Sequence, residues 1–183
     1  MSADHSVSPR SGAEVLSSVG SDDSTSSPSS SPLAPFFECW LDTFIFNGHI
    51  DPKLRELAIL RLMWRCDQSF EWAHHYRLAR QAGLSREEVL AIRTPDPDRD
   101  LQGEVAVVVR AVDDIVDRGV LAANTYAAVG ELFHEPGMLQ EFLYLVAGYR
   151  MFASVSATTH LTAESSGLRV WPPDGVGPTV PST

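Results

Sequence analysis

The residues best suited to chemistry lie on one predicted helix, which contains Glu71, His74 and His75. Residues three or four positions apart share a helix face, so Glu71 and His75 are expected to point inward together, while His74 falls on the wetter side. A carboxylate that holds one imidazole nitrogen fixes the tautomer and leaves the other nitrogen for proton transfer. The same spacing also fits a core histidine that is simply paired with Glu71.

A second carboxylate is predicted to face the same core. Glu56 lies on the same face of the preceding helix as Leu60 and Met63. Together with Glu71 and His75 it forms a candidate acid/base set. Burial of one carboxylate near another raises its pKa, which suits a proton relay.

The segments that carry these residues are predicted to be helices. Apolar residues at three- and four-residue spacing predict a first helix that ends at Asn47-Gly48, and Asp51-Pro52 is typical of a helix start. Ser85 with Glu88 predicts a capping box, and TPDPDRD predicts a loop. The sequence therefore predicts an all-α domain of six to seven helices over residues 36–46, 52–66, 70–82, 86–92, 101–118, 122–134 and 137–159.

Three segments carry a family resemblance: Leu54–Arg61, Phe70–His75 and Ala79–Ser85 followed by Glu87-Glu88. They resemble the carboxymuconolactone decarboxylase family, which shares its fold with the alkylhydroperoxidase-D-like proteins. The resemblance covers roughly residues 36–160 and is most specific over 52–92. It implies that the chain forms a homotrimer or homohexamer in which neighbouring subunits complete the pocket.

The cysteines of the alkylhydroperoxidase branch are missing. That pattern (Glu, eleven residues, Cys, two residues, Cys, three residues, His) falls here on Glu56, Gln68, Glu71 and His75. Cys66 has no partner three residues on, and a dithiol peroxidase needs one thiolate to attack and a second to resolve. The resemblance is therefore to the non-redox branch, whose name-giving reaction is decarboxylation of a lactone acid.

We accordingly expect a cofactor-free lyase or isomerase that acts on a small organic acid, lactone or polyketide-like metabolite, with His75, Glu71 and Glu56 as catalytic residues. Arg55 or Arg61 could hold a carboxylate or enolate oxygen, because a guanidinium binds it bidentately, and either could equally be structural. Trp72 is expected to contribute to the substrate pocket. No metal or cofactor is expected.

Two alternatives belong to other classes. Glu71-x-x-His74 and Glu131-x-x-His134 are the paired ligands of di-iron bundles, and Glu38 and Glu104 could be the lone glutamates. The chain could instead be a non-catalytic oligomeric binding protein.

Composition limits the remaining classes. The 183 residues carry a net charge of −10, which argues against nucleic-acid binding. No run of 18 apolar residues predicts a membrane span, and the N-terminus lacks a secretory apolar region, so a cytoplasmic protein is expected. Serine occupies 13 of the first 31 positions. We therefore predict a disordered tail over 1–34, a folded domain over 35–163 and an irregular Pro/Gly-rich tail over 164–183.

Overall fold

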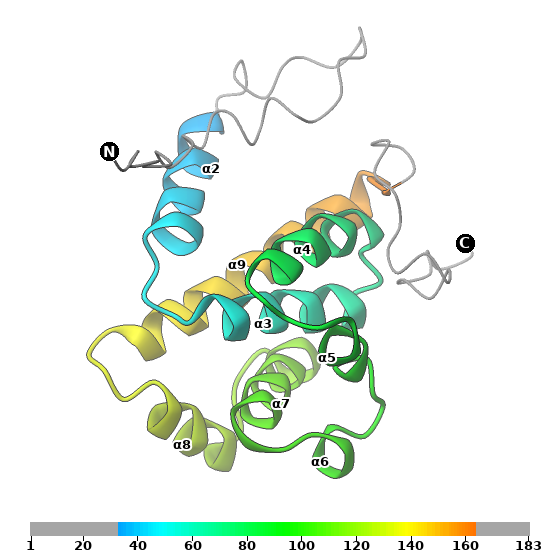
Figure 1. The fold of residues 1–183 in the computed structure, drawn as a ribbon. Helices are drawn as coiled ribbons and strands as arrows, with labels where there is room; N and C mark the ends of the chain where they lie inside the picture. The colour runs from blue at the N-terminus through cyan, green and yellow to red at the C-terminus, as the bar shows by residue number, and fades with distance from the viewer. Residues whose placement is uncertain (1–32, 164–183) are drawn as a thin grey trace, which may run out of the picture. The chain divides into compact units, whose positions relative to one another are not determined.

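The computed structural model describes residues 33–163, which are helical and contain no strand (Figure 1). The two predicted tails lie outside these residues, apart from the last two positions of the first. The chain divides into two compact units, Met1–Gly48 and His49–Thr183. None of the described helices is both long enough and apolar enough to cross a membrane.

The described part of the first unit is one aromatic helix. It begins as α2 (Ala34–Leu41) and continues as the π-helix η2 (Asp42–Phe46), with Asn47 as its C-cap. The rings of Trp40 and Phe44 lie 4.3 Å apart between centroids. No residue of either helix is buried, so this segment supplies no core of its own.

The second unit is built around α3 (Pro52–Arg65). Asp51 caps its first turn by accepting hydrogen bonds from the backbone N–H groups of Lys53 and Leu54, as the Asp-Pro pair predicts. The residues from Glu56 to Met63 are all buried. Such continuous burial requires neighbours on several sides, and α3 packs against α4, α7 and α9 (Figure 1).

The other helices begin and end close to the predicted positions. They are α4 (Ser69–Gln81), α5 (Arg86–Ala91), α7 (Gly103–Arg118), α8 (Ala123–Leu132) and α9 (Met138–Thr158). The capping box at Ser85 and Glu88 is present, which confirms the predicted start of α5. The valines of α7 are helical, with Val108, Val109 and Val112 in the core.

One predicted loop is partly helical. The TPDPDRD segment contains α6 (Pro97–Asp100), a single turn whose N-cap Asp96 accepts from the backbone N–H of Arg99. A proline after an aspartate can start a helix as readily as a turn, and here it starts a single helical turn. The described residues therefore hold eight α-helices and one π-helix, where six or seven helices were expected.

Candidate active site

The short connection between α3 and α4 determines which side chains meet. Helix α3 ends at Arg65, and Asp67 takes a left-handed backbone conformation with φ of 53°. Aspartate tolerates that region better than most residues do. The chain reverses there, so α4 packs back along α3 and brings His75 to Glu56.

His75 lies between two carboxylates. Its Nδ1 is 2.7 Å from Oε2 of Glu56, and its Nε2 is 3.8 Å from Oε2 of Glu71. The side chains of Glu56 and His75 are 0% and 4% exposed, whereas that of Glu71 is 18% exposed. Arg55 donates from Nε to the other oxygen of Glu56 at 3.0 Å. The structure thus brings together the three predicted catalytic residues and Arg55.

The closest partner of His75 differs from the sequence expectation. The helical period predicted that Glu71 would hold the ring, but the short hydrogen bond is made by Glu56, and Glu71 approaches the opposite nitrogen. Partners on one helix are set by spacing alone, while contacts between α3 and α4 depend on how the two helices pack. Spacing could therefore identify the group without assigning its hydrogen bonds.

The pKa values of the two carboxyl groups shift in opposite directions. Burial pushes the pKa of Glu56 up, but His75 and Arg55 outweigh it and the pKa is lowered. Burial raises the pKa of Glu71, and His75 offsets this only in part. Two carboxyl groups whose pKa values move apart are suited to different roles, one as a fixed anion and one as a proton carrier.

The direction of the short hydrogen bond follows from these charges. Ionised Glu56 can only accept, so Nδ1 of His75 is the donor. The neutral ring then has its free lone pair on Nε2, on the side of Glu71. Nε2 is therefore the ring nitrogen that is left available to accept a proton.

His74 is less exposed than predicted. It is half-buried, and its ring lies 5.4 Å from that of His75 between centroids. Burial, His75 and Arg77 lower the pKa of His74 to about 4, so it is neutral at physiological pH. The helical period correctly separated it from the Glu71 and His75 face but overestimated its contact with water.

With this geometry in view, comparison with known proteins identifies a family that part of the chain resembles. The match is to the carboxymuconolactone decarboxylase family. The family model matches residues 33–113, from the start of α2 to the middle of α7. No curated protein and no solved structure matches the chain. The predicted resemblance and the all-α fold are thereby confirmed, and all the predicted site residues lie inside the matched segment.

Among residues 33–163, no pair of thiols lies at the site. Cys66 is the cysteine near the α3–α4 connection, and burial raises the pKa of its thiol. Burial therefore holds the thiol in its unreactive protonated form. Gln68 and Glu71 stand where the peroxidase branch has cysteines, so the structure supplies no resolving thiol at those positions.

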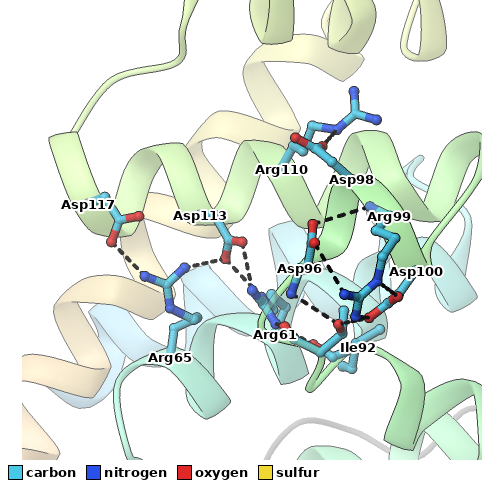
Figure 2. Close-up of polar contacts among 11 residues, drawn as sticks. Arg61, Arg65, Ile92, Asp96, Asp98, Arg99, Asp100, Arg110, Asp113 and Asp117 are labelled. Atoms are coloured by element: carbon cyan, nitrogen blue, oxygen red, sulfur yellow. Dashed lines mark hydrogen bonds and ion pairs between the residues drawn. The ribbon is translucent and has the colours of Figure 1, made fainter.

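Arg61 belongs to a different network, which Figure 2 shows between α3 and α7. Its Nε and Nη2 donate to the two carboxylate oxygens of Asp113 at 2.8 and 2.7 Å. Its Nη1 donates to the backbone carbonyls of Ile92 and Thr94 at 2.6 and 2.9 Å. These bonds tie α3 to α7 and to the segment after α5. A substrate contact by Arg61 stays a prediction, and this geometry gives it no support.

Trp72 lies in the core. It is 0% exposed, and its ring centroid is 5.8 Å from that of Trp64. Its predicted part in the substrate pocket likewise stays a prediction. Arg55 is the predicted substrate-binding residue that the structure places in the acid/base cluster, where it binds Glu56.

The structure does not assemble the ligands of the di-iron alternative. Among residues 33–163, no three His, Cys, Asp or Glu side chains are grouped so that they could hold a metal ion. Glu131 and His134 are both exposed, at the end of α8. His74 and His134 thus do not converge with Glu71 and Glu131 on one centre.

Proposed function

We propose that this domain is an acid/base enzyme, a cofactor-free lyase or isomerase that acts on a small organic acid, lactone or polyketide-like metabolite. The observation that carries the proposal is the placement of His75 between an ionised Glu56 and a Glu71 that retains its proton more readily. A buried imidazole with one nitrogen anchored and the other facing a proton carrier is equipped to move a proton.

The chemistry follows from the charges that such a reaction creates. Decarboxylation beside a conjugated carbonyl breaks the bond to the carboxyl carbon and leaves a dienolate, which must then receive a proton at carbon. In our proposal Nε2 of His75 delivers that proton, Glu56 stabilises the imidazolium that exists before delivery, and Glu71 returns a proton to the ring. Isomerisation uses the same groups in both directions.

Glu71 is the most exposed member of the candidate acid/base group. Its side chain is partly exposed, whereas those of Glu56, His75 and the neighbouring Tyr149 are buried. This exposure supports a role for Glu71 in exchanging protons between solvent and His75.

An isotope-exchange assay tests the proposal by following the transferred proton itself. The full chain is incubated in D₂O with a panel of unsaturated lactone acids, including the acid that gives the family its name, and deuterium at carbon is followed by NMR. His75→Gln is expected to slow exchange by about 10²–10⁴-fold, as loss of a general acid/base does. Full activity of this variant would refute the proposal.

His74→Gln is the matched control. It makes the same substitution one residue away on α4, and its effect on exchange is expected to stay within about threefold, because His74 stays neutral at working pH and does not form the imidazolium that would donate a proton. Glu71→Gln should be milder than His75→Gln, since it keeps a hydrogen-bonding group. Circular dichroism verifies that each variant is folded.

We also propose that the chain works as a homotrimer or homohexamer in the cytoplasm. Two described surfaces support self-association: the aromatic α2 and η2 segment, which buries none of its residues, and the outer face of α9, where Tyr144, Met151 and Val155 are exposed. Light scattering that detects only a 20.0 kDa monomer at micromolar concentration would contradict the oligomer. Cell fractionation tests the location.

A further inference from the structure

One aromatic residue outside the family match touches the candidate site. Tyr149 lies on α9, beyond the matched residues 33–113, and is 3% exposed. Its ring centroid is 5.0 Å from that of His75, with an interplanar angle of 86°. This is the edge-to-face arrangement that aromatic pairs prefer.

The contact supplies a restraint that the carboxylates do not. The hydrogen bond from Nδ1 to Glu56 restrains rotation of the His75 ring about the Cβ–Cγ bond, but one hydrogen bond still tolerates a range of tilt angles. At 3.8 Å, Glu71 is too distant for a hydrogen bond that would stop the tilt. The buried Tyr149 ring, packed at right angles, restricts the plane of the imidazole more closely than the half-buried His74 ring, whose centroid is 5.4 Å away.

Tyr149 is itself firmly held. The ring of Phe152 packs edge-to-face against it at 5.6 Å. On either side along α9, Leu145, Val146 and Ala153 are buried in the core. The ring is thus anchored to the main core of this unit.

The phenol group stays neutral. Burial raises the pKa of Tyr149 well above its usual value, and the charges of Glu71 and Glu56 raise it further. Tyr149 therefore keeps its phenolic proton beside these carboxyl groups and does not compete with Glu56 for the proton on Nδ1.

We propose that Tyr149 is a positioning residue, whose ring holds the His75 imidazole so that Nε2 faces Glu71 while Nδ1 stays bonded to Glu56. The inference rests on the proposed acid/base function and adds to it a residue that the family match does not cover. It assigns the effect to the aromatic ring and not to the hydroxyl group.

The experiment measures the Nδ1 proton of His75 in the full-length protein by NMR, with no substrate present. A buried proton held by Glu56 exchanges slowly with water and gives a downfield resonance, assigned by its loss in His75→Gln. Tyr149→Leu is expected to speed exchange of the Nδ1 proton with water by about tenfold, because the variant loses the aromatic pair and leaves a cavity beside His75. Tyr149→Phe keeps the ring and is expected to stay within about twofold of the wild type.

Tyr144→Leu is the matched control, because Tyr144 lies on the same helix but is 64% exposed. It should leave the resonance unchanged. The proposal is overturned if the Nδ1 proton exchanges at the wild-type rate in Tyr149→Leu. It is also overturned if this proton exchanges as fast in Tyr149→Phe as in Tyr149→Leu.

A second variant covers the case in which Tyr149→Leu does not fold. Phe152→Leu removes the ring that supports Tyr149 and changes a half-buried position. An exchange rate raised by about threefold supports the proposal, and an unchanged rate overturns it. Because this measurement needs no turnover, it remains informative even if the deuterium assay refutes the acid/base function.

Discussion

Replacement of Asp113 by alanine is expected to destabilise the domain strongly, because it leaves the Arg61 charge buried without its counter-ion. The Arg61 side chain is 3% exposed and donates four hydrogen bonds, two of them to Asp113. Removing one partner of a buried ion pair costs about 3–5 kcal/mol. Asp113 is 17% exposed, so water can enter the vacated space and the expected loss is about 3 kcal/mol.

Urea denaturation followed by tryptophan fluorescence measures this loss. Trp64 lies on α3, which the ion pair ties to α7, and Trp72 lies on α4, which packs against α3. With a denaturant dependence of about 2 kcal/mol per molar urea, the midpoint should fall by about 1.5 M. A fall in unfolding free energy of less than about 1 kcal/mol would refute the reasoning and restore Arg61 as a candidate substrate ligand.

Asp117→Ala is the control one turn further along α7. Asp117 pairs with Arg65 (Figure 2), at a distance of 2.6 Å. Its side chain is 55% exposed, so its loss should cost less than about 1 kcal/mol. The double variant Arg61→Met, Asp113→Ala removes both charges and should recover much of the lost stability. Recovery would show that the unpaired charge, and not the missing side-chain volume, causes the damage.

Three further predictions concern titration and metal content. Glu71→Gln should raise the unfolding free energy near pH 8 and not near pH 4. The raised pKa of Glu71 means that the folded state favours the protonated carboxyl group. The stabilisation from this group is lost as the pH rises from the ordinary pKa of 4.5 through the raised pKa, and glutamine does not lose it. His74→Gln should flatten the loss of stability on acidification from pH 6.5 to about 4, since the lowered pKa of His74 favours the neutral ring in the folded state. Thermal unfolding across pH checks both, and equal pH profiles for variant and wild type would contradict them. Purified protein should carry less than about 0.1 iron per chain by elemental analysis, whereas about two would favour the di-iron alternative.

Local features of the fold were predictable because their causes are local. Asp51-Pro52 and the Ser85 and Glu88 pair fix helix starts through hydrogen bonds within one turn, and both helices begin where expected. The single turn α6 was missed, since a four-residue helix has too few residues to show a period. Its only local indication is the Asp96-Pro97 pair, which resembles the start of α3.

The sequence predicted which side chains share a face of one helix, but it did not predict contacts between helices. The period placed Glu71 and His75 on one face of α4, where they are found. Which carboxylate bonds Nδ1 depends on the packing of α3 against α4, and no spacing encodes it. The Tyr149 contact crosses from α9, and the bidentate partner of Arg61 comes from α7, so neither was identified from sequence.

The reversal at Asp67 makes the site sensitive to chain length as well as to residue identity. Glu56 and His75 are 19 positions apart, yet their atoms meet across a connection of only a few residues. One residue inserted there would turn every later side chain of α4 by about 100° about the helix axis. All the site residues would then still be present in the sequence, but His75 would no longer meet Glu56. A search for working relatives of this domain should therefore score the interval between the two residues as strictly as the residues themselves.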